Sequence, residues 1–180
     1  LCAGLLLSGG IAVFKGWRQL RVSWRELMGC AAVGLMLPAL GNGLVVVAEH
    51  RGAPSGVAAL LVAAVPLWVI VYRVAAGDRP NTRTLAGVLF GFAGLVGLIA
   101  ASGLGGDVNI GACLIVVVAT IFWSFGSWST PRLPLPRNPF VMAVYEMLGG
   151  AVALFVMATV AGEHLLPEAA PADSWWAWGY

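Results

Sequence analysis

Five long apolar runs divide this chain, and they constrain its fold more than any other feature. They cover residues 27–48, 55–72, 85–102, 110–130 and 140–162, each about 18 to 23 residues long. At a rise of 1.5 Å per residue, a helix of about 20 residues crosses the hydrocarbon core of a bilayer. Four runs hold no charged residue, and the last holds only Glu146. The pattern predicts an all-α fold, a polytopic bundle of transmembrane helices.

The overall composition agrees with a membrane protein. The chain of 180 residues is 60% hydrophobic and 10% charged, whereas soluble domains are about 25% charged. Its net charge of +2 is spread between the apolar runs, so we expect no nucleic-acid partner. Cys2, Cys30 and Cys113 are far apart in apolar segments, which argues against a disulfide framework or a metal site.

Both ends of the sequence resemble parts of helices. Residues 1–14 are apolar but too short to span a bilayer. The nearby cations, Lys15 and Arg18, follow this run and do not precede it, unlike those of a signal peptide. We expect the second half of a helix here. Residues 174–180, rich in Trp, are expected to be the entrance of a further helix.

The charges between the runs indicate the orientation. From the first connection to the last, the basic residues number four, one, three, none, two and none. Cytoplasmic loops of membrane proteins carry an excess of Lys and Arg. The alternation therefore predicts that the odd-numbered connections are cytoplasmic and that every run crosses the membrane. With its single lysine against nine arginines and its many Ala and Gly residues, the chain resembles one from a GC-rich bacterium. We expect a multi-pass protein of the bacterial inner membrane.

Two prolines interrupt the runs. Pro38 and Pro66 each lie near the middle of a predicted helix. Proline removes a backbone hydrogen bond and kinks a helix, and transporters use such breaks to build binding sites and gates near the membrane midplane. We therefore name both as candidate gating or kink residues. A static kink that serves packing is the alternative.

Glu146 is the ionisable residue that lies well inside a run. A carboxylate in hydrocarbon is costly, so it should face the bundle interior and be protonated, paired or hydrated. That chemistry suits a proton-coupling or cation-binding site. A structural hydrogen bond, or a place in a water-filled cytoplasmic vestibule, would explain it equally.

A polar stripe follows the run 110–130. Thr120, Ser124 and Ser127 have i, i+4, i+7 spacing and share one helix face, with Trp123 beside them. The hydroxyl groups and the indole predict a lining for a small organic solute, and the alternative is hydrogen bonding between helices. The candidate substrate-binding residues are Trp123, Ser124, Ser127 and Glu146. Further candidates for a cavity wall are Asn42, Trp68, Tyr72 and Tyr145.

Glycines share one face of the run 85–102. Gly87, Gly91, Gly94 and Gly97 are spaced by four, three and three residues. Small residues on one face allow two membrane helices to approach closely. We therefore expect this face to pack against another helix.

Signatures of enzymes are missing from the sequence. It has no Walker A, His-Glu-x-x-His or Gly-x-Ser-x-Gly pattern, and no run holds a pair of carboxylates. We expect no enzymatic activity, no catalytic residue, no cofactor and no metal.

Several segments together resemble the EamA-type transporters of the drug/metabolite transporter superfamily. The first is Gly41-Asn-Gly-Leu-Val-Val-Val-Ala-Glu-His50, followed by an Ala-rich run that begins at Ala53 and by Val65-Pro66-Leu67-Trp68. Residues 83–100 resemble that family's Gly-rich fifth helix, and residues 119–127 with Arg132 resemble its sixth helix and exit. The order and spacing of these segments carry the resemblance.

The resemblance implies a fragment of a ten-helix transporter built from two inverted repeats. Residues 1–102 would hold most of the first repeat, helices 2–5, with helix 1 missing. Residues 103–180 would hold helices 6 and 7 and the entrance of helix 8. The implied function is a secondary transporter that exports small metabolites, amino acids or drugs by alternating access. Its partners would be a small-molecule solute, a proton as coupling ion and the lipid bilayer. A non-transporting scaffold or subunit of a membrane complex is the alternative.

Overall fold

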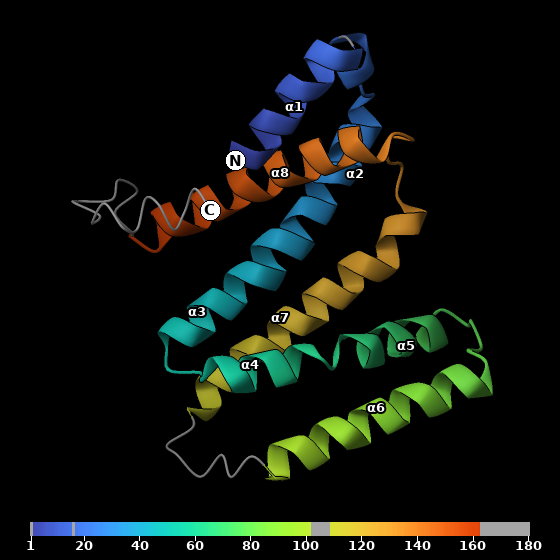
Figure 1. Ribbon diagram of the computed structural model, residues 1–180, viewed down its shortest axis with the longest axis vertical. Coiled ribbons are helices and arrows are strands. Elements are labelled where there is room, and N and C mark those ends of the chain that lie inside the picture. Colours follow the sequence, from blue (N-terminus) through green and yellow to red (C-terminus); the bar gives the residue numbers. More distant parts are fainter. Residues whose placement is uncertain (1, 16, 102–108, 163–180) are drawn as a thin grey trace.

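Helices make up all the regular structure of the described chain. The computed structural model describes residues 2–15, 17–101 and 109–162 (Figure 1). The α-helices are α1 (Cys2–Lys15), α2 (Trp24–Gly34), α3 (Leu44–His50), α4 (Ser55–Val62), α5 (Val65–Ala75), α6 (Thr82–Ala101), α7 (Ile110–Ser129) and α8 (Pro139–Val160). Two short 3-10 segments are η1 (Trp17–Leu20) and η3 (Thr130–Arg132), and η2 (Leu35–Gly43) is a π-helix. The predicted entrance of a further helix at 174–180 lies outside the described residues.

Four helical stretches are long and apolar enough to cross a membrane. They are Trp24–His50, Ser55–Ala75, Ile110–Arg132 and Pro139–Val160, with 27, 21, 23 and 22 residues. α6 has 20 residues and is also apolar, although its described apolar part, Thr82–Leu98, is shorter than the other four. The predicted all-α, polytopic fold class is confirmed. The run at 55–72 differs from one continuous helix, because the chain turns at Ala63 and Ala64 and forms α4 and α5.

Local sequence signals explain where the helices begin and end. Ser23 and Glu26 form a capping box at the start of α2, in which each side chain accepts a hydrogen bond from the other residue's backbone N–H. Asn109 and Asn138 cap α7 and α8 through their side-chain oxygens. Gly52, which follows α3, has a φ of 93°, a left-handed conformation that glycine adopts without strain.

The connections between helices gather at two ends of the bundle (Figure 1). At one end, Arg21 before α2 and Arg137 before α8 line the same cavity. At the other end, the Asn109 side chain before α7 donates a hydrogen bond to the Arg51 carbonyl after α3, at 2.9 Å. The first and fifth connections thus meet at one end, and the second connection meets the start of α7 at the other. This arrangement agrees with the alternation predicted from the loop charges.

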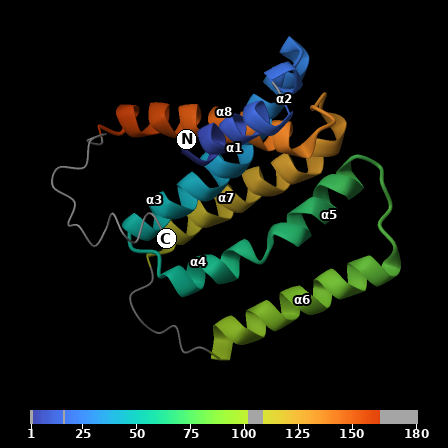
Figure 2. The ribbon, with the colours of Figure 1, turned by 45° about the horizontal axis from the view of Figure 1, so that its top comes forward.

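The π-helix η2 lies at the centre of the packing. Helices α7 and α8 both pack against it, and α8 also packs against α1 and α2. Fully buried side chains of the bundle include Cys30 and Val33 on α2, Val116 on α7, and Val141 and Val144 on α8. In both views α6 lies at the edge of the molecule, beside α4 and α5 (Figures 1 and 2).

Candidate functional site

The backbone of the membrane-spanning stretch Trp24–His50 changes from α-helix to π-helix in its middle. Residues Leu35–Gly43 form η2, with Pro38 inside it. Proline has no N–H to donate to the preceding turn, and a π-helical segment within an α-helix is rare and frequent at functional sites. The predicted kink residue Pro38 therefore lies in an irregular segment near the middle of a transmembrane stretch.

Glycines hold this segment against α8. A Cβ on Gly34 would meet the backbone carbonyl oxygen of Glu146. A Cβ on Gly150 would meet the Pro38 ring and lie 2.9 Å from the Gly34 carbonyl oxygen. We call Gly34, Pro38, Glu146 and Gly150 the glycine seam. Because neither glycine has a side chain, the two backbones come close enough for Cα–H···O contacts.

Glu146 lies at this seam with part of its carboxyl group shielded. Its Oε1 is buried and has no hydrogen-bond partner among the described residues. The residue as a whole is partly buried, and the α2 that packs on α8 carries the fully buried Cys30. A buried carboxyl oxygen without a donor is costly in an apolar setting. The geometry therefore leaves this oxygen free to take up a proton, a cation or a water molecule.

Trp123 packs against a different part of η2. Its Cβ and ring lie 3.4 and 3.2 Å from the place where a Cβ on Gly41 would be. The next small residue of α7, Gly126, lies against Met36 and Leu37. Trp123 on α7 thus contacts η2 at Gly41, whereas Glu146 on α8 lies against Gly34, the last residue of α2.

Ser124 is fully buried and joins α7 to α5. Its hydroxyl lies 2.5 Å from the Thr120 carbonyl oxygen and 3.2 Å from the Val65 carbonyl oxygen, with both as acceptors. Val65 stands directly before Pro66, which is exposed at the start of α5. These contacts favour the structural interpretation of Ser124, because its hydroxyl stabilises the break at Pro66.

The rest of the polar stripe divides in two. Thr120 is buried and donates to the Val117 carbonyl within its own helix, at 2.7 Å. Ser127 is exposed and has no hydrogen-bond partner in the part of the chain that the structure describes. A shared helix face therefore does not mean a shared environment, and Ser127 is the hydroxyl still available to a solute.

An aromatic cluster near the C-terminal end of α7 was not expected from the sequence. The Tyr72 ring packs against Phe125 and Trp128, with centroids 5.4 and 5.9 Å apart. The Tyr72 hydroxyl donates to the Ile121 carbonyl at 3.1 Å. Arg132 lies over the Trp128 ring, 4.1 Å from its centroid. Tyr72, a candidate for a cavity wall from the sequence, thus joins α5 to α7.

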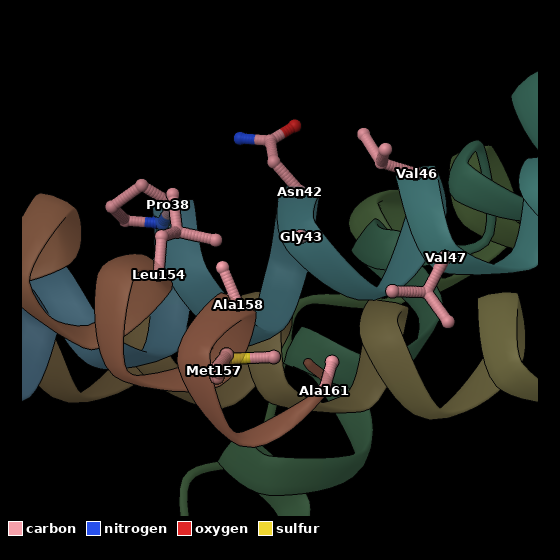
Figure 3. Close-up of a pocket in the computed structure, with 9 residues that line it drawn as sticks. All are labelled: Pro38, Asn42, Gly43, Val46, Val47, Leu154, Met157, Ala158 and Ala161. Carbon is pink, nitrogen blue, oxygen red and sulfur yellow. The ribbon is translucent and has the colours of Figure 1, made fainter. Parts of the chain in front are cut away.

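A cavity of about 300 Å³ opens beside η2 (Figure 3). Its lining residues come from η2, α3 and α8: Pro38, Asn42, Gly43, Val46, Val47, Leu154, Met157, Ala158 and Ala161. Asn42 carries the one side-chain amide among them, and in Figure 3 it stands on η2 between Pro38 and Val46. An apolar cavity with one polar group resembles the binding sites of small molecules. In the sequence, the spacing of four residues between Pro38 and Asn42 was the feature that could have predicted that both line one cavity.

A second, smaller cavity lies at the other proline. It has a volume of about 170 Å³ and lies between the α4–α5 break and α6, with Pro66, Gly87 and Gly91 in its lining. The structure therefore does not gather the candidate residues into one site. Pro38, Trp123 and Glu146 lie around η2, whereas Pro66 and Ser124 lie around the break before α5.

Residues 2–15, 17–101 and 109–162 contain no cluster of three or more His, Cys, Asp or Glu side chains that could hold a metal ion. The polar groups around η2 are instead amide, hydroxyl and carboxyl groups of the kind that bind organic solutes.

Comparisons with known proteins agree with this geometry. Residues 1–100 match the family model of the EamA-like transporter family. The chain is 37% identical over 141 residues to the "uncharacterized inner membrane transporter YedA" of Escherichia coli K12, and equally to those of O6:H1 strain CFT073 and O157:H7. The aligned part is 78% of this chain but 45% of each relative, so the chain spans less than half of the relatives it matches. No solved structure matches.

Proposed function

Because the chain belongs to the EamA-like transporter family, we propose that it forms part of a secondary transporter that exports small metabolites, amino acids or drugs by alternating access. Multi-pass membrane transport in the inner membrane follows from the family, the relatives and the four membrane-spanning stretches. The export direction, the solute class and the coupling ion are our own proposals beyond what the family indicates. The relatives are named as transporters, and we infer that this protein is not an enzyme.

The observation that carries the proposal is the exposed amide of Asn42 in the cavity beside η2. Asn42 stands eight residues before the end of the stretch at His50, about 12 Å along a helix. It has no hydrogen-bond partner within the described ranges. An amide that faced lipid unpaired at this depth would cost several kcal/mol. We infer that Asn42 faces a solute pathway, where it can donate to and accept from a polar group.

The candidate residues take different roles in this proposal. The apolar wall with one amide suits a solute with an apolar body and one polar group. Trp123 would stack against the solute near η2 and Ser127 would hydrogen-bond it, while Ser124 supports the break at Pro66. Pro38 and Pro66 would allow the two broken helices to bend when the pathway changes its open side. The pathway would run between the two repeats, residues 1–102 and 103–180 with the rest of the protein.

Glu146 is the proposed coupling group. Its unpartnered Oε1 at the seam between η2 and α8 could bind a proton in one conformation and release it in the other. We predict that Glu146→Gln abolishes the pH dependence of transport and leaves membrane insertion intact, because an amide keeps the shape but cannot exchange the proton. Solute flux measured at several external pH values checks this, and an unchanged pH dependence in the variant would remove Glu146 from the coupling.

Comparing small molecules in the growth medium tests export directly. The complete gene would be overexpressed in a bacterial host, beside Asn42→Leu as the impaired variant and Val152→Leu as a control outside the cavity lining. We expect a solute enriched outside the cells with the intact protein and with Val152→Leu, a change at an exposed position of α8 outside the cavity lining, but not with Asn42→Leu. Equal media from all three strains and the empty host would contradict export.

A non-transporting scaffold is the alternative, and the family and its relatives do not favour it. A scaffold would need a fixed protein partner on a surface such as the exposed glycine face of α6. Co-purification of one partner in constant ratio, together with no solute flux in either direction, would support the scaffold and overturn the transporter proposal.

A further inference from the structure

A polar cavity lies at the end of the bundle where the connections before α2 and before α8 meet. Its volume is about 280 Å³, and it is lined by Arg21, Val22, Glu26, Pro136, Arg137, Asn138 and Val141. It lies away from the cavity beside η2 and shares no lining residue with it. The proposed transport site therefore does not account for it.

The charges in this cavity are unbalanced. The Glu26 carboxylate accepts hydrogen bonds from the Ser23 backbone N–H at 2.7 Å and from the Ser23 hydroxyl at 2.8 Å, so the helix cap already uses it. Arg21 and Arg137 are both exposed, and neither forms an ion pair or side-chain hydrogen bond among residues 2–15, 17–101 and 109–162. Two guanidinium groups thus face one cavity with one occupied carboxylate. Guanidinium groups pair with phosphate through two parallel hydrogen bonds.

The surroundings place the cavity at the surface of the bilayer. Trp24, in the first turn of α2, is 71% exposed, and Phe140, in the first turn of α8, is 58% exposed. Exposed aromatic rings at the ends of transmembrane helices lie at the level of the lipid headgroups. The loops that carry Arg21 and Arg137 are those predicted to be cytoplasmic, and the cytoplasmic leaflet holds anionic lipids. The phosphate of a lipid headgroup lies at this depth, and the exposed Trp24 and Met28 offer an apolar surface for its acyl chains.

We propose that Arg21 and Arg137 form a site for the phosphate group of an anionic phospholipid in the cytoplasmic leaflet. The phosphate would lie between the two guanidinium groups, and the acyl chains would follow the exposed side chains of α2 and α8. This site depends on the membrane orientation and not on the transport activity. Its failure would therefore leave the export proposal untouched.

A lipid titration of the complete protein tests the site. The purified protein in detergent would receive dioleoyl-phosphatidylglycerol, dioleoyl-phosphatidylcholine or inorganic phosphate, and its thermal unfolding temperature would be followed. We expect phosphatidylglycerol to raise this temperature and phosphatidylcholine and inorganic phosphate to leave it unchanged. Arg21→Gln alone should weaken the apparent affinity for phosphatidylglycerol about fivefold, and the double variant with Arg137→Gln about 20-fold.

The matched control is Arg25→Gln with Arg83→Gln. This pair removes the same charge from exposed positions on the same side, outside the cavity lining. The affinity of the control for phosphatidylglycerol should stay within about fivefold of that of the intact protein. The control changes only the overall charge near the membrane and leaves both cavity arginines in place. Equal losses in the two double variants, equal stabilisation by phosphatidylcholine, or stabilisation by inorganic phosphate would each overturn the lipid site. The side chains of all four arginines lack hydrogen-bond and ion-pair partners in the described ranges, so we expect every variant to fold.

Discussion

Two groups of glycines in this molecule have opposite surroundings. In the glycine seam, Gly34 and Gly150 lie against the backbone and the proline ring of the facing helix. On α6, a Cβ added to Gly87, Gly91, Gly94 or Gly97 would meet nothing within 4 Å among the described residues. The sequence prediction that the α6 glycines pack against another helix is not met by any helix of this part of the chain. Two helices approach closely only where small residues face another helix. Gly34 and Gly150 face one, because each lies against the chain that carries the other.

The two regions also differ in how closely their side chains and backbones are packed. The seam joins the π-helix to α8 through backbone contacts that leave no room for a side chain. Phe90 on α6 is 80% exposed, and the helix borders a cavity at Pro66. If the two regions differ as we describe, substitutions that are alike in chemistry should have effects of different size and sign.

The largest effect is expected at the seam. Gly34→Ala would place a methyl group against the Glu146 carbonyl oxygen, and backbone cannot move aside as a flexible side chain can. Overpacking of this kind costs about 1–3 kcal/mol. We expect a lower thermal unfolding temperature and a smaller folded yield for the complete protein in detergent. A variant as stable as the intact protein would show that α2 and α8 are not held this closely.

A smaller loss is expected at the break before α5. Ser124→Ala removes the hydroxyl that contacts the Val65 carbonyl oxygen and should cost about 1 kcal/mol. Ser127→Ala is the matched control, because Ser127 is exposed and unpartnered in the described structure. Its stability should not change, whereas its solute flux should fall if Ser127 binds the solute. Equal stability losses in the two variants would contradict the separation of their roles.

The smallest effect is expected on α6. Gly94→Ala meets open space, and alanine in a helix is favoured over glycine by about 0.5–1 kcal/mol. We expect unchanged or slightly higher thermal stability of the complete protein. A clear loss of stability would reveal a helix packed on this face, and it would remove the contrast between the two glycine groups.

The sequence predicted the helices well because membrane spans depend on one strong signal, the length of an apolar run. Loop charges, which report on orientation, also agree with the two ends at which the connections gather. Spacing alone could not tell Ser124 from Ser127, since burial depends on which helix faces each turn. The π-helix at 35–43 could not be predicted from the sequence either. Pro38 indicates that the α-helix is interrupted, but it does not indicate which hydrogen-bond pattern replaces it.

Chemical labelling of single cysteines tests most directly whether the face of η2 that carries Asn42 lines a water-filled pathway. Asn42→Cys and Gly94→Cys would be made in the complete protein after replacing its native cysteines, and intact cells would be treated with a membrane-impermeant maleimide. We predict that Cys at position 42 is labelled, that the transported solute protects it, and that Cys at position 94 stays unlabelled. Labelling at 94 but not at 42, or no labelling at 42 in either orientation of the membrane, would contradict a solute pathway beside η2.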